Sequence, residues 1–330
     1  MNKKLLSICV TSYNRVNELI RCLESIDSQH NDIEIIISED NSPQKKNIES
    51  KVLEFSKTSK YNIVFNSNSK NLGYDNNLRK LISLATSEYI LFVSDDDQLI
   101  SGSLDKILKI IYENKNYGLY YSPFYDRENN VMKRKYDKNH IINKGEINAG
   151  NRIFDAILFS GLIFKKEYIY DYGIDFTNLN YFQVFVFLDI LIKNDGYYIN
   201  EPLIDCVGDG ENAYGISESS RSNNLLANRK KIISNLEFHK GLIKVIQHVD
   251  FVNNTNIFFR FQRQYSLRSY TGLLKARKES KESFNLYWKT LNELDIKLSF
   301  ITKIYYNSIK FFGAKITEIL FFVPKMIFKR

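Results

Sequence analysis

The sequence predicts an α/β protein with a Rossmann-like, mostly parallel central sheet flanked by helices, followed by a helical carboxyl-terminal extension. Across residues 1–207, short apolar runs alternate with segments whose apolar residues recur at helical spacing. This alternation is typical of parallel strands joined by helices that cover both faces of a sheet. Residues 225–330 show helical spacing throughout and become increasingly basic. We therefore expect an α/β domain and an appended helical region.

The first elements alternate strictly. The predicted strands are residues 5–10, 33–38, 61–66 and 89–94, and the predicted helices between them are residues 17–28, 46–58 and 78–86. The first helix is the clearest, because Leu19, Ile20, Leu23 and Ile26 fall on one face. Short polar connections separate these elements, as in other α/β units.

The pattern is less regular after residue 100. Residues 104–114 predict a helix, 117–125 a strand, 181–193 a strongly apolar helix and 197–199 a last short strand. Residues 126–150 are polar with few apolar anchors, so we expect an insertion or a mobile loop over the site. Residues 208–224 are rich in Gly, Ser and Asn and predict a flexible linker between an α/β domain, 1–207, and the helical region, 225–330.

Composition narrows the class of protein. Of the 330 residues, 44% are hydrophobic and 25% are charged, which is typical of a folded globular protein and excludes wholesale disorder. The net charge of +8 favours an anionic partner. The three cysteines have no metal-binding spacing, the amino terminus lacks a secretory signal pattern, and no apolar stretch is long enough to span a bilayer. These features predict a cytoplasmic protein.

Three consecutive carboxylates, Asp95, Asp96 and Asp97, follow the strand predicted at 89–94. Carboxyl ends of parallel strands form the binding crevice of an open α/β sheet. Unpaired, the three charges would repel one another, and a hard cation such as Mg2+ or Mn2+ would relieve the repulsion while leaving positions for phosphate oxygens. The triplet therefore indicates a metal and diphosphate site, although a solvated acidic turn that caps the next helix has the same sequence.

Other strands end in polar groups as well. Thr11, Tyr13 and Asn14 follow the first strand, and Asp40 follows the second. At one edge of a sheet, a hydroxyl, an aromatic ring and a carboxylate could hold a nucleobase and a ribose. Individually, Thr11 and Asn14 could equally be helix caps, and Asp40 a turn residue.

Taken in order, four segments resemble the family-2 glycosyltransferases of the GT-A fold, including bacterial surface-polysaccharide sugar transferases. The segments are SICVTSYNR at 7–15, EIIISEDNS at 34–42, NLG at 71–73 and EYILFVSDDD at 88–97. The resemblance extends over residues 5–205. It implies a nucleotide-sugar-binding half, 1–100, followed by an acceptor-binding half, 101–207.

The resemblance also implies roles in donor binding. Thr11, Tyr13 and Asn14 match the segment that contacts base and ribose, and Asp40 matches the carboxylate at the pyrimidine edge, which favours a UDP-, CDP- or dTDP-sugar. Asn71 and Gly73 match the segment beside the diphosphate, where glycine permits close backbone approach. Arg79 is a diphosphate candidate or a solvated helix charge. Asp96 aligns with the metal-binding carboxylate, Asp97 supports the metal, and Asp95 or Asp97 reaches the donor ribose.

The implied reaction is inverting transfer to an acceptor hydroxyl, which requires a general base. The family usually has a Glu-Asp pair where this chain has YFQVF at 181–185, and the nearest carboxylate is Asp189, which is equally explained as a buried structural acid. Gly161 matches the floor of the acceptor site, with Asp155 and Gln183 expected nearby. Residues 208–224, with Glu211, Asn212 and Arg221, match a flap over the diphosphate or form a plain linker.

Residues 300–330 mix apolar and aromatic side chains with six basic residues and one acid, Glu318. Such a segment suits a helix in an anionic membrane interface, or alternatively a hairpin packed on the core. With the family resemblance, it indicates a peripheral protein at the inner face of the cytoplasmic membrane, acting on a lipid-linked glycan. No nucleic-acid-binding motif accompanies the basic residues.

Two other functions remain open at this point. A sugar-phosphate nucleotidyltransferase would need a Gly-rich loop with a signature Arg and Lys after the first strand, and residues 11–17 lack it. A degenerate GT-A module that binds glycan or nucleotide without turnover would explain the missing Glu-Asp pair.

Overall fold

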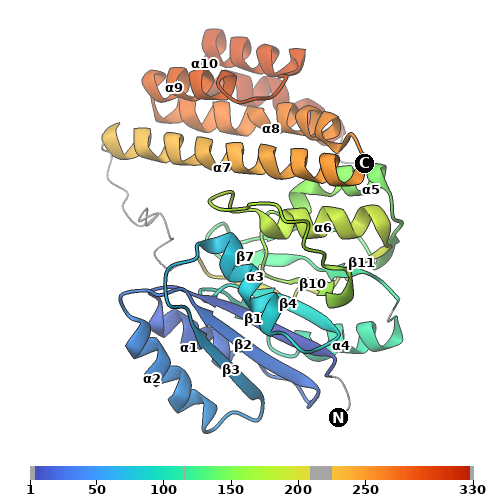
Figure 1. Ribbon diagram of the computed structural model, residues 1–330. Coiled ribbons are helices and arrows are strands. Elements are labelled where there is room, and N and C mark those ends of the chain that lie inside the picture. The colour runs from blue at the N-terminus through green and yellow to red at the C-terminus, as the bar shows by residue number, and fades with distance from the viewer. Residues whose placement is uncertain (1–3, 115, 209–224, 328–330) are drawn as a thin grey trace.

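A computed structural model describes residues 4–114, 116–208 and 225–327, with an eight-stranded sheet at the centre (Figure 1). The strand order is β3-β2-β1-β4-β10-β6-β11-β9. The strands are β1 (Leu6–Ser12), β2 (Ile33–Glu39), β3 (Asn62–Ser67), β4 (Tyr89–Val93), β6 (Leu119–Tyr121), β9 (His140–Ile142), β10 (Leu162–Lys165) and β11 (Gly196–Tyr198).

The direction of the strands fixes where their ends meet. Strands β1 to β4 are mutually parallel, β10 runs antiparallel between β4 and β6, and β11 is parallel to β6. Consequently β1, β2, β3, β4, β6 and β11 all end at the same edge, which we call the carboxyl edge. The sheet is mixed in its second half because β10 and the edge strand β9 run the other way.

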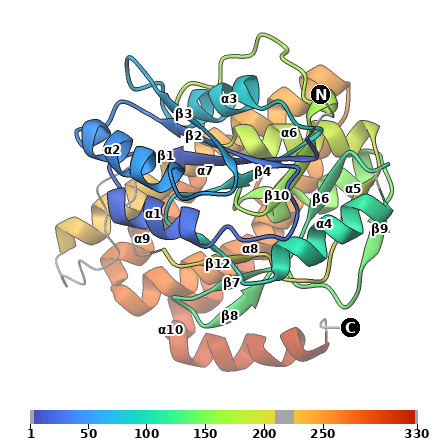
Figure 2. The same cartoon turned by 90° about the horizontal axis from the view of Figure 1, so that it is seen from below.

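Helices cover both faces of this sheet, as predicted. One face packs against α1 (Val16–Glu24), α2 (Lys45–Ser56) and α4 (Ser103–Glu113). In Figure 2, α1 and α4 lie below strands β1 and β4, and α3 lies above them. The other face packs against α3 (Tyr74–Leu84), α5 (Glu146–Asn151) and α6 (Phe182–Lys193). In β1, Ile8 and Val10 belong to the buried cluster on the side of α1, α2 and α4, and Cys9 belongs to the cluster on the side of α3, α5 and α6. This alternation is expected of a strand that is buried on both faces.

Two predictions after residue 100 were wrong. The strand predicted at 117–125 is divided at Pro123 into β6 and β7 (Phe124–Asp126), which belong to different sheets. Proline lacks the N–H needed to continue a ladder. Residues 126–150, expected to form an insertion or a mobile loop, contain β8 (Val131–Lys133), β9 and α5, so the loop alternative was wrong. A small sheet of order β5-β12-β7-β8, with β5 (Gln98–Leu99) and β12 (Ile204–Cys206), joins these segments.

The carboxyl-terminal helices form layers stacked on α5 and α6 (Figure 1). They are α7 (Leu225–Asn253), α8 (Ile257–Glu279), α9 (Lys281–Asn292) and α10 (Phe300–Ile327). Val245, Ile246 and Phe261 belong to the same buried cluster as Phe185 and Phe187 of α6. The helical region therefore shares a core with the α/β part instead of forming a loosely tethered domain.

Helix α10 packs on α8 and is interrupted at Gly313, whose φ of 75° breaks the helical path. Its outer side leaves apolar residues exposed: Phe300, Phe311, Phe312, Ile316, Ile319 and Leu320. Within the described residues, no helix combines the length and apolarity needed to cross a bilayer.

Candidate active site

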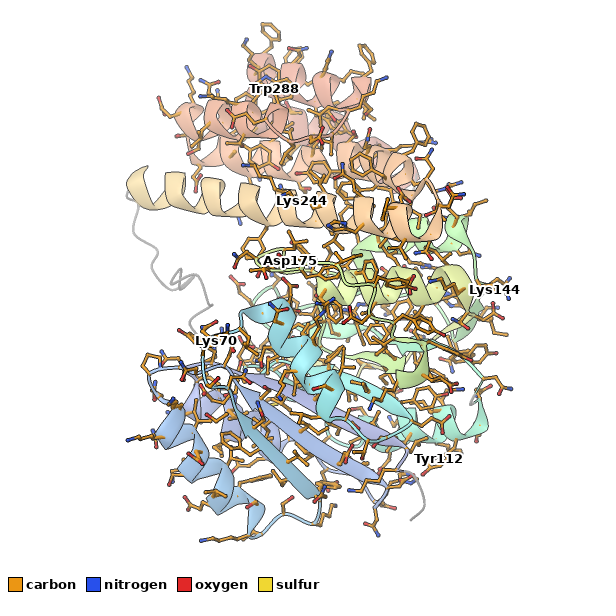
Figure 3. The ribbon with its side chains drawn as sticks, in the orientation of Figure 1. Lys70, Tyr112, Lys144, Asp175, Lys244 and Trp288 are labelled. Carbon is orange, nitrogen blue, oxygen red and sulfur yellow. The ribbon has the colours of Figure 1, made fainter. Side chains whose placement is uncertain are left out.

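The polar strand ends predicted to meet do meet at the carboxyl edge. Ser12 is paired in register with Glu39, and the Asp40 amide donates a hydrogen bond to the Ser12 carbonyl at 2.9 Å. The Tyr13 amide donates to Asp95 Oδ2 at 3.1 Å. In Figure 3, Lys70 lies beyond the end of β3 at this edge, whereas Tyr112, at the end of α4, lies at the opposite side of the sheet.

The three carboxylates after β4 point to different partners. Asp95 Oδ1 lies 2.8 Å from Arg15 Nη1, and Asp96 Oδ2 lies 3.0 Å from the same nitrogen. Asp97 instead accepts a hydrogen bond from Ser160 Oγ at 2.5 Å. Among the residues the structure describes, no three His, Cys, Asp or Glu side chains are arranged around one metal position. The triplet is therefore not a three-carboxylate cage.

Burial raises the pKa of two of these groups. Burial raises the pKa of Asp95 to about 7, against the lowering effect of the Arg15 charge. Burial, followed by the charge of Asp96, raises the pKa of Asp97 to about 7 as well. Arg15 therefore neutralises part of the charge of the triplet, and the metal expected at this position stays a prediction.

Asp96 is the member of the triplet that fits a divalent cation. Its side chain is 16% exposed, against 4% for Asp95, and its oxygens suit a hard ion. Ser94 Oγ holds the other Asp96 oxygen, Oδ1, at 2.5 Å, which orients the group. One carboxylate together with substrate phosphates is a common way to bind Mg2+. Asp97 is buried beneath it, so the arrangement does not favour Asp97 as a second ligand.

Asp40 organises the loop that follows β3. Its carboxylate accepts hydrogen bonds from Asn68 Nδ2 at 2.9 Å, from the Leu72 amide at 2.8 Å and from the Gly73 amide at 3.0 Å. Asn71 Oδ1 also accepts from the Gly73 amide. Gly73 has a φ of 76°, and an added Cβ would meet no atom within 4 Å. Glycine is needed there for its backbone conformation, not for lack of space.

The segment after β1 leaves space at the beginning of α1. Thr11 is half-buried, the Tyr13 ring is exposed, and Asn14 has a φ of 58°. A pocket of about 320 Å³ is lined by Asn14, Arg15, Val16, Asn17, Glu18 and Gln44. Arg15 lines this pocket and also contacts Asp95 and Asp96, so the pocket adjoins two of the carboxylates.

Arg79 is neither a solvated charge nor placed for a diphosphate. Its Nη2 contacts Asp171 Oδ1 at 3.1 Å and the Ile174 carbonyl at 3.0 Å. The guanidinium also lies 5.1 Å from the Phe176 ring centre and 5.2 Å from that of Phe182. It holds the segment before α6 against α3, and these contacts account for Arg79 without a diphosphate.

The segment at 160–161 forms the floor beneath the triplet. Ser160 Oγ accepts from the Ser94 amide at 3.0 Å while it donates to Asp97, and the Gly161 amide donates to the Phe92 carbonyl. Gly161 has a φ of 82°, and an added Cβ would lie 3.0 Å from Ile204. Through Ser160, this segment is hydrogen-bonded to Asp97 of the triplet.

The other predicted acceptor and base residues have separate surroundings. Gln183 is buried, and its amide bonds the Ile157 carbonyl and the Tyr74 hydroxyl. Asp155, in the 3-10 turn η1 (Ile153–Ala156), accepts hydrogen bonds from the Tyr121 and Tyr136 hydroxyls.

Asp189 is buried in the last turns of α6. Its carboxylate contacts Lys193 Nζ at 2.6 Å, Asn253 Nδ2 at 2.9 Å and the Tyr172 hydroxyl at 3.0 Å. None of these partners belongs to the carboxyl edge, so the surroundings favour a structural acid.

The sequence analysis assigned no role to Arg15 or Ser160, although Arg15 lies in the segment 7–15 and Ser160 directly precedes Gly161. Their partners are far away in sequence, and no local pattern marks them. Glu211, Asn212 and Arg221 lie outside the described residues.

Comparison with protein families matches residues 7–173 to glycosyl transferase family 2. An abequosyltransferase, RfbV, of Salmonella typhimurium is 28% identical over 63% of this chain and 68% of its own. A GalNAc(5)-diNAcBac-PP-undecaprenol beta-1,3-glucosyltransferase of Campylobacter jejuni is 33% identical over 32% of this chain and 33% of its own.

Solved structures agree in fold. S. aureus TarS, residues 1–349 in complex with UDP-GlcNAc, superposes with a TM-score of 0.54 at 16% identity, over 88% of this chain and 80% of that one. The mannosyltransferase PcManGT of Pyrobaculum calidifontis, in complex with GDP-Man and Mn2+, gives a TM-score of 0.53 at 13% identity, over 89% and 75%.

Proposed function

The chain belongs to glycosyl transferase family 2, and from that premise we propose an inverting transfer of a sugar from a pyrimidine-nucleotide donor to a hydroxyl of a lipid-linked or polysaccharide acceptor, in synthesis of a bacterial surface glycan. The observation that carries this proposal is the convergence of the ends of β1, β2 and β4 around one partly exposed carboxylate, Asp96. The convergence supplies a nucleotide crevice beside a cation ligand.

Two residues, Tyr13 and Asp40, support the proposed pyrimidine-nucleotide donor. The exposed Tyr13 ring is free to stack on a base. Asp40 Oδ2 accepts one hydrogen bond, from the Gly73 amide, so it retains a lone pair for a pyrimidine N–H. Structural relatives bind UDP-GlcNAc or GDP-Man, and the carboxylate is our reason for preferring a pyrimidine.

The leaving nucleoside diphosphate would be stabilised by a divalent cation, Mn2+ or Mg2+, held by Asp96, which would neutralise the charge that develops on it. Asp95 fixes the backbone at Tyr13 and the position of Arg15, and Ser94 orients Asp96. Ser160 supports the floor of the site through Asp97. These contacts keep the donor side rigid.

A lipid-linked acceptor is supported by two observations. The name of the Campylobacter relative specifies a glycan on undecaprenol. In this chain, the outer side of α10 presents exposed Phe311 and Ile319 beside exposed Lys310 and Lys315. Apolar and cationic groups on one helix suit the interface of an anionic membrane, so we place the protein at the inner face of the cytoplasmic membrane.

The general base is better assigned to Asp155 than to Asp189. Asp155 is partly exposed and receives a hydrogen bond from Tyr121, the last residue of β6, so it lies at the carboxyl edge on the acceptor side. Asp189 is fully engaged elsewhere. A carboxylate at the acceptor position can remove the hydroxyl proton during attack.

Hydrolysis of a panel of nucleotide sugars with Mn2+ tests the proposal. We expect slow turnover of a pyrimidine-nucleotide sugar that falls at least a hundredfold in Asp96→Ala, since loss of a transition-state ligand costs about 3 kcal/mol or more. Glu54→Ala is the matched control, because Glu54 is an exposed acid on α2. Binding of donors without turnover in the wild-type protein would instead support a degenerate binding module.

A further inference from the structure

Three arginines gather around Asp155 on the acceptor side, and we call Arg134, Arg152 and Arg268 the arginine cluster. Arg134 follows β8, Arg152 follows α5, and Arg268 lies on α8. The cluster adjoins Tyr121, the last residue of β6, which bonds Asp155. It therefore lies at the carboxyl edge, beyond the floor formed by Ser160 and Gly161.

Arg134 is a partly buried cation without an ion-pair partner among the described residues. Its Nη2 donates to the Leu158 carbonyl at 2.8 Å and its Nη1 to the Ser122 carbonyl at 3.4 Å. The Nε atom is buried and has no hydrogen-bond acceptor within the described part of the chain. The guanidinium lies 5.1 Å from the centre of the Phe124 ring. Burial lowers the pKa of Arg134 to about 10, although it remains charged at neutral pH.

The other two arginines, Arg152 and Arg268, do not neutralise the positive charge of the cluster. Arg152 Nη1 lies 3.6 Å from Asp155 Oδ2, and its guanidinium lies 4.1 Å from the centre of the Tyr136 ring. Arg268 lies 4.1 Å from the centre of the Phe154 ring. Asp155 is the one carboxylate these three guanidinium groups share, and its Oδ2 already accepts from two tyrosines. Among the residues that the structure describes, Arg152 has Asp155 as an ion-pair partner, whereas Arg134 and Arg268 have none. Arg268 is exposed to solvent and Arg134 is partly buried, so Arg134 is the cation whose missing counter-charge is the most costly.

Buried arginines in purely structural networks are normally balanced by carboxylates, because an uncompensated buried charge is costly. A site that binds an anion has the opposite requirement: it holds spare guanidinium donors before the ligand arrives. Guanidinium groups suit phosphate and carboxylate oxygens, and neighbouring aromatic rings can cover a sugar face.

We propose that the arginine cluster binds an anionic oxygen-bearing group of the acceptor, next to the hydroxyl that is glycosylated. The inference rests on the proposed function and narrows its acceptor to an anionic glycan or glycolipid. Either the diphosphate of a lipid carrier or an acidic group on the sugar would supply the shared oxyanion chemistry. The helical region takes part, since α8 contributes Arg268.

Calorimetric titration with phenyl phosphate in EDTA, which removes cation-dependent binding at Asp96, tests the cluster directly. We expect the wild-type protein to bind phenyl phosphate and not neutral phenyl glucoside. Arg134→Met and Arg152→Met should each weaken binding at least tenfold, as expected for loss of a charged hydrogen bond. Lys289→Met is the control, because Lys289 is an exposed cation on α9, and it should leave the affinity unchanged.

A structural role would give a different pattern. Arg134→Lys keeps the charge, so it should retain most of the binding lost in Arg134→Met, and the paired Arg152→Met variant provides the same test should Arg134→Met fail to fold. Unchanged affinity in both methionine variants, or displacement of phenyl phosphate by UDP, would overturn the proposal.

Titration with two further ligands distinguishes the two sources of the anion. Tighter binding of phenyl diphosphate indicates a lipid diphosphate, and tighter binding of phenyl glucuronide indicates an acidic sugar. Absence of donor hydrolysis in the wild-type protein would contradict the proposed transfer while leaving the binding result in place, so the two failures are distinguishable.

Discussion

At the scale of single residues, Arg15 is the counter-charge of two carboxylates of the triplet, beside the position proposed for a cation. Its Nη1 lies within 3.0 Å of both Asp95 and Asp96, although it is separated from Asp95 by 80 positions in the sequence. The guanidinium of Arg15 neutralises the two carboxylates through noncovalent contacts, so their oxygens stay available to a metal ion. Arg15 therefore stabilises the site before donor and cation bind.

Replacing Arg15 should expose this role. We expect Arg15→Met to lower the free energy of unfolding by about 3 kcal/mol, because Asp95 and Asp96 lose their counter-charge in a buried site. Mn2+ should restore stability to this variant more than to the wild-type protein, since the ion replaces the lost charge. Urea unfolding with and without Mn2+ measures both effects, and Arg15→Lys is the control. Equal Mn2+ responses in all three proteins would contradict the assignment.

Asp155 and Asp189 provide a matched comparison of two acids. Asp155→Asn should reduce the rate of transfer to acceptor by about a hundredfold or more, in line with the usual contribution of a general base. Asp189→Asn should lose about 1–3 kcal/mol of stability, because Lys193 loses its partner, while transfer continues. Steady-state kinetics with acceptor and thermal unfolding separate the two; the reverse pattern would restore Asp189 as the base.

At the scale of elements, two left-handed glycines position the loops around the site for different reasons. Gly73 and Gly161 have similar φ values, 76° and 82°, but only Gly161 faces an atom, Ile204 Cγ1 at 3.0 Å. A side chain at either position strains the backbone, and at Gly161 it also requires the Ile204 side chain of β12 to shift.

Alanine at the two glycines should therefore differ in cost. Gly73→Ala is expected to lower the free energy of unfolding by about 1–2 kcal/mol from backbone strain alone. Gly161→Ala should lose about 1–3 kcal/mol more, because the added methyl overpacks the contact with Ile204. Thermal or urea unfolding measures both values. Equal losses would show that the Ile204 contact relaxes freely.

Helix α6 begins where Asp75 of α3 caps it. The Asp75 carboxylate accepts hydrogen bonds from the Asn180 amide at 2.6 Å and the Phe182 amide at 2.8 Å. This cap replaces a local one, since the residue before the helix, Tyr181, provides no side-chain acceptor. Burial raises the pKa of Asp75 to about 6, against the lowering effect of these amides.

The raised pKa gives a pH dependence with a definite sign. A carboxyl with a folded-state pKa above its unfolded value of about 3.9 favours the folded state below that value and loses the contribution as the pH rises to about 6. The stability deficit of Asp75→Asn should therefore shrink between pH 4 and pH 7, by up to about 3 kcal/mol. Urea unfolding of both proteins across this range measures it, and a deficit that grows with pH would mean that the amides hold the carboxylate ionised.

At the scale of the whole molecule, α7 and α8 share a core with the α/β part, while α10 lies outermost and exposes apolar side chains (Figure 1). Residues 300–327 pack on α8 and bury Ile309, as the packed-hairpin alternative for this segment requires. The exposed apolar side chains of α10 are the feature on which the proposed membrane contact rests. Glu318, the one acid in this segment, is paired with Lys278 of α8.

Polar substitutions on the outer side of α10 should reduce membrane binding without affecting folding. We expect Phe311→Ser with Ile319→Ser to reduce binding to phosphatidylglycerol vesicles at least tenfold, because each lost apolar side chain contributes about 1.5–3 kcal/mol on burial. The thermal midpoint should hardly change. Phe251→Ser is the control, since Phe251 is 85% exposed on α7. Vesicle flotation measures binding; unchanged flotation would assign α10 to another partner.

The sequence by itself determined the elements of the donor half and the chemical character of their ends. Hydrophobic periodicity is a local property, so β1 to β4 and α1 to α3 were predictable from it, and parallel strands bring their ends to one edge wherever they pair. The family segments likewise depend on residues close together in the chain.

Only the tertiary structure decided which groups neutralise the triplet, which carboxylate stays accessible and how residues 126–150 are ordered. Arg15 and Asp95, or Ser160 and Asp97, meet across long stretches of chain, and β9 is stabilised by pairing with β11. Protonation and exposure depend on burial by neighbours from every part of the fold. The periodicity of the sequence gives no information about those neighbours, because side chains acquire their partners only when the elements pack.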